Sequence, residues 1–187
     1  MDPDWVVAAL ADCSEEVLLA QLEVPVAVLL AAARARPRRL VLNPAPVLDV
    51  AVLQPLLEHV DILVPNRSEL GQLAGAATPI TLDDVVQCAA ALAFSGTLVV
   101  TLGGDGAVVI DDSGRIVEHV PAPPVQPVDT SGAGDAFCGV LVHELARPGG
   151  DLSSAVRRAV ALATTSTRHE GAQVPRTFGH FDERTAG

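Results

Sequence analysis

The sequence has no lysine and no tyrosine, and each of its 12 basic residues is an arginine. Without lysine, catalysis through a lysine Schiff base is excluded. A bound phosphate would have to be held by arginine, by backbone amides or by a metal ion. Aromatic residues make up only 3% of the chain, whereas 49% of its 187 residues are hydrophobic. We therefore expect a sizeable core built from alanine, valine and leucine.

Cysteine and long apolar runs are scarce as well. The three cysteines, Cys13, Cys88 and Cys138, are scattered and odd in number, which fits neither a disulfide framework nor a zinc-binding motif. No apolar run reaches the roughly 18 residues that a membrane span needs, and the acidic start differs from the basic start of a signal peptide. We expect a cytoplasmic protein with reduced thiols.

Positive charge is outnumbered, because 23 acidic residues give the chain a formal net charge of −11 at pH 7. An acidic surface repels the phosphate backbone of nucleic acids, so nucleic-acid binding is disfavoured. The expected partner is a small molecule rather than a nucleic acid or a membrane. The length fits one domain over residues 1–187, and residues 174–187 are expected to form a loose tail.

Short apolar runs that are typical of strands alternate with helix-like segments over the first hundred residues. The expected strands are at residues 17–23, 40–43, 61–65 and 97–102. This order is typical of βαβ units and predicts an α/β fold with a mostly parallel sheet flanked by helices. Two antiparallel strands, 107–110 and 115–120, are expected to follow through a hairpin turn. Two long helices are expected to complete the chain after a proline-rich link.

A glycine-rich turn, SGAGD at residues 131–135, leads into the first of these two helices. The unpaired amides and partial positive charge of a helix N-terminus attract anions, so a phosphoryl group could bind there. Asp135 stands at the same helix start and could accept the proton of an attacking hydroxyl. The alternative is that the glycines make a tight turn and Asp135 only caps the helix. The motif taken alone favours this alternative.

Other polar residues are expected at the same edge of the sheet, where ligands bind in open α/β folds. Asn66 and Glu69 follow the third expected strand at a spacing that suits a contact with magnesium, water and phosphate, or a helix cap with an acidic first turn. Thr101 begins a strand-to-turn segment that could contact a nucleotide or be an ordinary junction. Glu23 and the NPAP segment at residues 43–46 also follow strands.

Together these motifs resemble the ribokinase-like (PfkB) family of carbohydrate kinases. DTSGAGDAFCG at residues 129–139 is similar to the second signature of that family, VDILVPNRSEL at 60–70 to its Asn-x-x-Glu metal motif, and VVTLGGDGAVV at 99–109 to its ATP-phosphate strand and turn. QLEVP at 21–25 and LNPAP at 42–46 are most similar to the ribokinase branch, and TRHEGAQ at 167–173 resembles its monovalent-cation loop. The resemblance extends over about residues 17–173.

The resemblance implies transfer of the γ-phosphoryl group of ATP to the terminal hydroxyl of a pentose, with ribose as the expected sugar. ATP, Mg²⁺ and K⁺ are the implied cofactors. The implied catalytic groups are the base Asp135 and an anion hole formed by the amides of Gly132, Ala133 and Gly134. The residues implied in nucleotide binding are Asn66 and Glu69, which would organise Mg-ATP, and Thr101, Gly103, Gly106 and Gly134. Glu23 would contact the sugar, together with Asp135. The implied potassium ligands, which would act largely through backbone carbonyls, are Asp129, Ser131, Thr165, Arg168 and Gly171.

The sequence departs from the family pattern in several places. It has no counterpart of the N-terminal part of the family, which supplies an aspartate, a Gly-Gly sugar loop and a small β-sheet lid. We therefore expect a ribokinase-like fold that lacks the N-terminal strands and the lid. Ala159 stands where the family often has asparagine or histidine near the adenine, and Cys138 replaces an asparagine of the signature. His169 and Glu170 add one residue to the cation loop.

Several alternatives remain open. The chain could be a non-catalytic nucleotide-binding fragment that needs a separate N-terminal half, or it could form a homo-oligomer. It could also be a related kinase for a nucleoside or a fructose derivative. A Rossmann dinucleotide-binding protein is disfavoured, because the glycines at residues 103–106 follow a late strand and lack the GxGxxG spacing.

Overall fold

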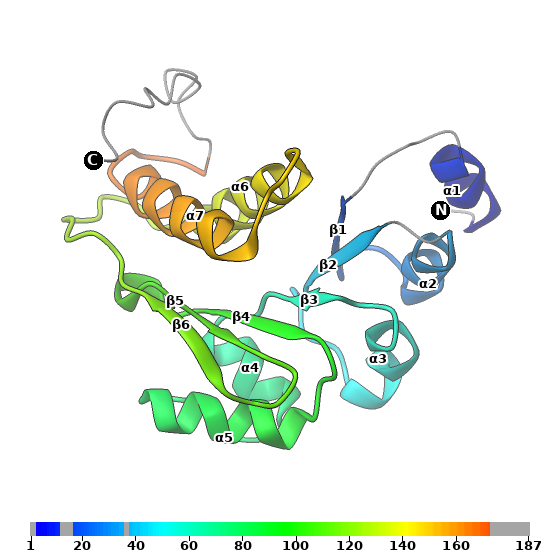
Figure 1. The fold of residues 1–187 in the computed structure, drawn as a ribbon, viewed down its shortest axis with the longest axis horizontal. Helices are drawn as coiled ribbons and strands as arrows, with labels where there is room; N and C mark the ends of the chain where they lie inside the picture. Colours follow the sequence, from blue (N-terminus) through cyan, green and yellow to red (C-terminus); the bar gives the residue numbers. More distant parts are fainter. Residues whose placement is uncertain (1–2, 12–16, 36–37, 173–187) are drawn as a thin grey trace.

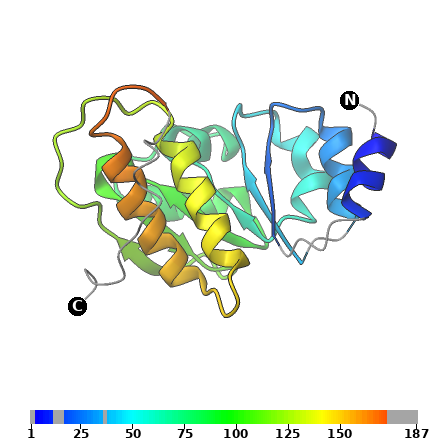
Figure 2. The ribbon, with the colours of Figure 1, turned by 90° about the horizontal axis from the view of Figure 1, so that it is seen from above.

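The computed structural model describes residues 3–11, 17–35 and 38–172, and the tail expected at residues 174–187 lies outside them. The described residues form three layers, with a twisted sheet in the middle and helices on both of its faces (Figures 1 and 2). In this part of the chain, no helix combines the length and the apolar character that crossing a bilayer requires. The expected α/β fold with a mostly parallel sheet is confirmed.

Within the described residues the sheet has six strands, and their order in space is their order along the chain. The strands are β1 (Val17–Gln21), β2 (Arg39–Asn43), β3 (Ile62–Leu63), β4 (Thr97–Thr101), β5 (Ala107–Ile110) and β6 (Ile116–Val120). Strands β1 to β4 are parallel to one another. The last two strands pair antiparallel, as the expected hairpin requires.

The helices divide between the two faces of the sheet. They are α1 (Pro3–Ala11), α2 (Val26–Arg34), α3 (Val50–Leu57), α4 (Arg67–Leu73), α5 (Leu82–Leu92), α6 (Ala133–Ala146) and α7 (Leu152–Ser166), with a 3-10 turn, η1 (Gly103–Asp105), after β4. Helices α6 and α7 cover one face, and α2 to α5 pack on the other (Figure 1). Helix α1 packs against α2 beyond the edge of the sheet.

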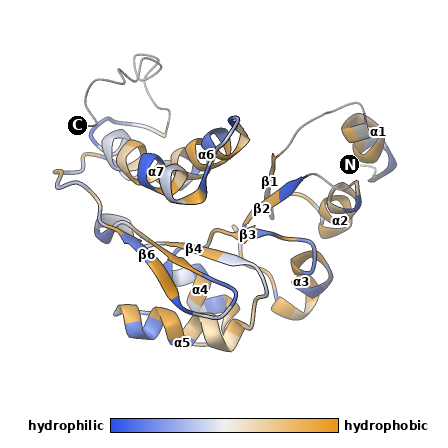
Figure 3. Cartoon of the chain, viewed as in Figure 1, coloured by the Kyte–Doolittle hydropathy of each residue, from blue (hydrophilic) through white to orange (hydrophobic). Residues whose placement is uncertain are grey.

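Successive side chains along the strands pack alternately into two separate hydrophobic cores, one on each face of the sheet. In β4, Leu98 and Val100 point into the core shared with α2 to α5, whereas Val99 points into the core shared with α6 and α7. Because both faces are covered, the interior residues of β2, β4 and β5 are apolar without alternation. The edge strand β6 differs, since it contains Glu118 and His119 and alternates in burial. Figure 3 shows this as hydrophobic colour along the central strands, with hydrophilic patches on α5 and α7.

Some element boundaries differ from the expected ones. Strand β1 ends at Gln21, so Glu23 lies in the turn that follows. Thr81 caps α5 in a reciprocal capping box with Asp84, as its sequence indicates. Helix α1 was not expected. It is only nine residues long, and Trp5 is 66% exposed, so its apolar residues give no periodic signal of a buried face.

Candidate active site

Polar side chains gather where the parallel strands end. Gln21 and Asn43 are the last residues of β1 and β2, and they are direct neighbours in the parallel register. Asn66 follows β3 and forms a bridge with Thr101, the last residue of β4. The four residues therefore share the carboxyl edge of the sheet, which is the edge where α/β proteins bind ligands.

Gly132 sets the backbone at the start of α6. Its φ angle of 73° is left-handed, and a Cβ atom added there would lie 2.6 Å from the carbonyl oxygen of Ala172. Both features require glycine at this position. The amide of Ala133 donates to the Thr130 carbonyl at 3.2 Å and is thus used within the turn. This use leaves the amide of Gly134 as the better candidate for the expected anion hole.

Asp135 does not cap its own helix. The N-cap of α6 is Gly132, and no side chain accepts a capping hydrogen bond there. Instead, Oδ1 of Asp135 accepts a hydrogen bond of 3.1 Å from Nε2 of Gln21 at the end of β1. The carboxylate is therefore directed across the sheet edge, and the simple capping interpretation of this aspartate is wrong.

Asn66 and Glu69 form the helix cap that was the alternative to a metal contact. The Asn66 side chain accepts from the Glu69 amide at 2.9 Å, and the Glu69 carboxylate accepts from the Asn66 amide at 2.8 Å. Burial raises the pKa of Glu69, and the backbone hydrogen bond from Asn66 partly offsets this. Among the described residues, no group of three or more His, Cys, Asp or Glu side chains could enclose a metal ion. A magnesium ion would have to be shared with phosphate oxygens and water, which is how this ion is commonly bound.

Cys138 links the two acidic motifs electrostatically. Burial raises the pKa of its thiol to about 12, and the negative charges of Asp135 and Glu69 add to the shift. Asp135 and Glu69 are 66 positions apart in sequence (135 − 69), yet both carboxylates raise the pKa of this thiol.

A cleft of about 310 Å³ opens beside the start of α6. Four of the residues expected to bind the nucleotide line it, namely Thr101, Gly103, Gly106 and Gly134, together with Ala133 of the expected anion hole. Asn66 and Glu69 do not line this cleft. Its largely apolar lining suits a flat heterocycle.

The sequence prediction missed two walls of this cleft. One is the proline-rich link, which contributes residues 122–125, and the other is α7, which contributes Val160, Ala163 and Thr164. Ala159, expected near the adenine, is fully buried in the core instead. Ala163 stands one helical turn further on, so the 3.6-residue period of α7 was the signal that could have found it.

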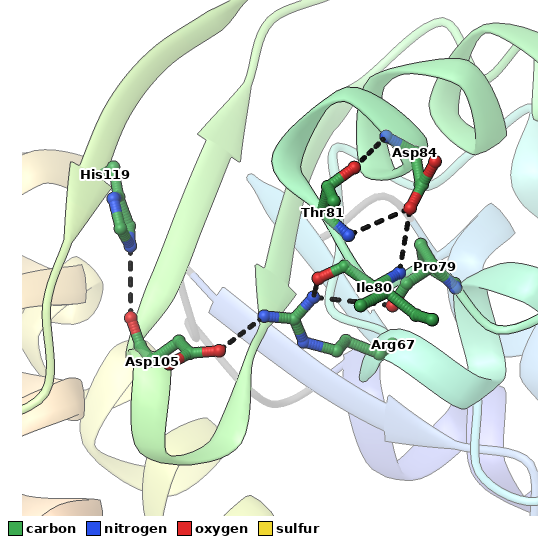
Figure 4. Close-up of polar contacts among 7 residues, drawn as sticks. All are labelled: Arg67, Pro79, Ile80, Thr81, Asp84, Asp105 and His119. Atoms are coloured by element: carbon green, nitrogen blue, oxygen red, sulfur yellow. Dashed lines mark hydrogen bonds and ion pairs between the residues drawn. The ribbon is translucent and has the colours of Figure 1, made fainter.

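Arg67 connects three segments of the chain, which are the start of α4, the loop before α5 and the turn η1 (Figure 4). Its guanidinium donates to the Asp105 carboxylate at 2.7 Å, and to the carbonyls of Pro79 and Ile80 at 3.3 and 2.5 Å. His119 in turn lies 3.0 Å from the Asp105 carbonyl through Nε2. The side chain that directly follows Asn66 thus holds the glycine-rich turn η1. No sequence motif had singled out this ion pair.

The residues expected to bind potassium lie in two segments that contact each other, the loop before α6 and the end of α7 with the loop that follows it. Oδ1 of Asp129 accepts from the Ser131 amide at 2.8 Å, and Oδ2 accepts from the Gly171 amide at 2.9 Å. Hydrogen bonds from Ser131 and then from Gly171 lower the pKa of Asp129, so this carboxylate is held as an anion. The amide of Arg168 donates to the Thr165 carbonyl at 3.2 Å at the end of α7. Asp129 thus stabilises the loop itself, and its two oxygens are already engaged by amides.

Glu23, the expected sugar contact, is exposed in the turn after β1. Within the described part of the chain, no hydrogen bond of its side chain is found. The contact with Asp135 is made by Gln21, two residues earlier. In the sequence, Gln21 stands out only as the first residue of the QLEVP segment at 21–25.

The chain is similar in sequence and in fold to several known sugar kinases. A deoxyribokinase of Salmonella typhi is 37% identical over 134 residues, which are 71% of this chain and 42% of that protein. A ribokinase of Staphylococcus aureus is 30% identical over 179 residues, covering 92% of this chain and 57% of the relative. The structure of Arabidopsis thaliana ribokinase with ribose and ATP superposes with a TM-score of 0.77 at 26% identity, covering 92% of this chain and 55% of that one.

The chain spans about half the length of these relatives. The ribokinase-like fold that the motifs implied is confirmed. A model of pfkB family carbohydrate kinases matches residues 6–177, which is most of the sequence. The chain therefore belongs to the pfkB family of carbohydrate kinases.

Proposed function

We propose that this chain carries the nucleotide site and the catalytic base for phosphoryl transfer from ATP to the terminal hydroxyl of a pentose, with ribose as the expected acceptor. One observation carries the proposal. Consecutive residues of the first turn of α6 face two different sites: Ala133 and Gly134 line the cleft, whereas Asp135 points to the strand edge. A nucleotide on one side and a sugar on the other would meet at this turn.

The chemistry follows from that placement. The base and ribose of ATP would occupy the apolar cleft, with the phosphates toward η1 and the start of α6, where the helix dipole favours negative charge. Asp135 would accept the proton of the sugar hydroxyl as its oxygen attacks the γ-phosphorus and the bond to the β-phosphate breaks. Catalysis of this kind depends mainly on positioning and electrostatic stabilisation.

Two cations would support this reaction. Mg²⁺ would neutralise phosphate charge near Asn66 and Glu69. Each carboxylate oxygen of Glu69 accepts one hydrogen bond from Asn66 and retains a second lone pair for a water bound to the ion. K⁺ would bind through backbone carbonyls of the loops that carry Asp129, Ser131, Thr165, Arg168 and Gly171. The amides that hold Asp129 keep these two loops together.

A second candidate acceptor is 2-deoxyribose. The relative named deoxyribokinase supports it. A nucleoside or fructose derivative remains a third candidate of the same reaction class.

The first prediction tests the reaction and its base together. Sugar-dependent ADP formation is measured with ribose, 2-deoxyribose and fructose, and ATP binding is measured separately. Asp135→Asn should keep ATP affinity within about twofold and lower turnover roughly 10²–10⁴-fold, the usual effect of removing a general base. Asp112→Asn, in the exposed hairpin turn, is the matched control and should leave both unchanged.

Nucleotide binding without turnover in the unsubstituted chain would contradict the kinase proposal and favour a nucleotide-binding role. Near-normal turnover in Asp135→Asn would remove the base assignment alone.

A further inference from the structure

A chain of side-chain amides leads from the sheet to Asp135. Nδ2 of Asn43 donates to the carbonyl of Val64 at 2.8 Å. Nε2 of Gln21 donates to Oδ1 of Asn43 and to Oδ1 of Asp135, both at 3.1 Å. The three parallel strands β1, β2 and β3 are thus connected through their ends to the first turn of α6.

The orientation of both amides is fixed by their partners. A backbone carbonyl only accepts, so Asn43 must turn its NH₂ group to Val64 and its oxygen to Gln21. An ionised carboxylate also only accepts, so Gln21 must turn its NH₂ group to both Asn43 and Asp135. The parallel register, which pairs Gln21 directly with Asn43, places the two side chains next to each other. No other orientation satisfies all three contacts.

We propose that Gln21 is a positioning residue that fixes the carboxylate of Asp135 for catalysis, an inference that rests on the proposed function. Asp135 is exposed and lies on the first turn of a helix, so its side chain would otherwise rotate freely. Gln21 holds Oδ1, the carboxylate oxygen with a hydrogen bond in the described structure. Oδ2 has no hydrogen bond to the described residues and would be the oxygen that accepts the proton of the hydroxyl.

A neutral amide suits this role better than a charged group. A cation at position 21 would hold the same oxygen but would weaken Asp135 as a proton acceptor, because an ion pair favours the ionised carboxylate. A carboxylate would repel it. The amide restrains the geometry and leaves the charge of Asp135 in place for the reaction. Orientation of this kind is worth up to about 100-fold in rate when a shift of about 1 Å displaces a reacting group.

The test compares Gln21→Met with Gln72→Met in the 187-residue chain. Methionine has nearly the length of glutamine but lacks the amide. Gln72, which donates to Ser68 on its own helix, is the matched control. With ¹³C-labelled aspartate, the carboxyl carbon of Asp135 is assigned through Asp135→Asn, and its resonance reports on the contact directly. Gln21→Ala is the second variant, for use where Gln21→Met does not fold.

We expect Gln21→Met to move the Asp135 carboxyl resonance, to lower kcat by about 10- to 100-fold and to leave KM for ATP within about twofold. Gln72→Met should change none of these. An unmoved resonance in Gln21→Met, or a moved resonance with unchanged kcat, would overturn the positioning role while the kinase proposal stands. A resonance that moves in a chain without any turnover would instead overturn the proposed function and, with it, the catalytic part of this inference.

Discussion

Cys138 is the residue whose environment is most unusual for its type. Its side chain is 2% exposed, on the inner face of α6, and its thiol faces the charge of Asp135 and Glu69. Each of these conditions opposes loss of the proton, which is why the pKa of the thiol is raised to about 12 from an ordinary value of 9.0. The thiol is thus a packing group of the site and a poor nucleophile.

The second prediction follows from that raised pKa. The unfolded thiol ionises near pH 9 and the native one near pH 12, so the stability that this group contributes is present below pH 9 and is lost as pH rises toward 12. The unfolding free energy should fall by at most about 1.4 kcal/mol per pH unit in this window. Lysine and tyrosine, which would titrate here, are absent from the chain. Burial also raises the pKa of Cys88, so that thiol contributes to the same alkaline slope. Urea unfolding at pH 8 to 11 measures the slope.

Cys138→Ala should flatten this alkaline slope, whatever constant loss of stability its smaller side chain causes. Val140→Ala, which shortens an apolar side chain of the same helix, is the control, and its slope should match that of the unsubstituted chain. An equally steep fall in Cys138→Ala would show that other groups carry the alkaline dependence.

At the scale of elements, the turn η1 depends on a helix that is distant in sequence. Arg67 begins α4, and Asp105 ends η1, 38 positions later. The Arg67 side chain is 21% exposed, whereas that of Asp105 is 72% exposed, so solvent weakens the pair on the side of the turn. The carbonyls of Pro79 and Ile80 hold the guanidinium in place from the other side. We call these contacts of Arg67 with Asp105, Pro79 and Ile80 the Arg67 clamp. The clamp restrains the glycine-rich turn η1.

The third prediction concerns this clamp. Arg67→Met should weaken ATP binding by about tenfold, because hydrogen bonds to charged groups are worth about 1.5–3 kcal/mol and exposure of Asp105 reduces that value. Isothermal titration with ATP measures the change, and KM for the sugar should stay the same. Asp105→Asn should reproduce the effect, and the double variant should be no worse than Arg67→Met alone.

Arg115→Met, which breaks an exposed pair with Asp111 in the β5–β6 hairpin, is the control for the clamp. Unchanged ATP affinity in Arg67→Met would show that the turn holds its shape without this arginine.

The elements themselves could largely be predicted from the sequence, because their signals are local. The strand positions, the hairpin and the Thr81 cap depend on residues within a few positions of each other. The contact of Gln21 with Asp135 and the pair of Arg67 with Asp105 depend on how distant segments pack, and no local pattern encodes that. For the same reason, the Asn66–Glu69 spacing suited both a cap and a metal contact, and the structure shows the hydrogen bonds of the cap.

At the scale of the whole molecule, the cleft lies between the sheet and the helical layer formed by α6 and α7. The β4–η1 turn, the proline-rich link, α6 and α7 each supply part of its lining. A ligand bound there would therefore connect the sheet to the helical layer above it. Ligands that bind only the native state stabilise it by mass action.

The fourth prediction is that ATP raises the melting temperature of the chain. At a concentration of 100 times Kd, the gain is about 2.7 kcal/mol, which corresponds to about 5–10 °C for a chain of this size. Ala163→Phe should fill the cleft and abolish the shift. Ala90→Phe, on the exposed side of α5, should retain it. Differential scanning calorimetry with and without ATP measures both. A shift that survives in Ala163→Phe would place the nucleotide elsewhere.

The strand order has a consequence for synthesis. Because each strand pairs with the strand that precedes it in the chain, the sheet can grow at one edge as the polypeptide leaves the ribosome. The carboxylate of Asp135 is made 114 residues after Gln21, when all six described strands have already been translated. A nascent chain thus holds the turn η1 and the amide network before the proposed base is made. The proposed site would be completed only when the final pair of helices docks.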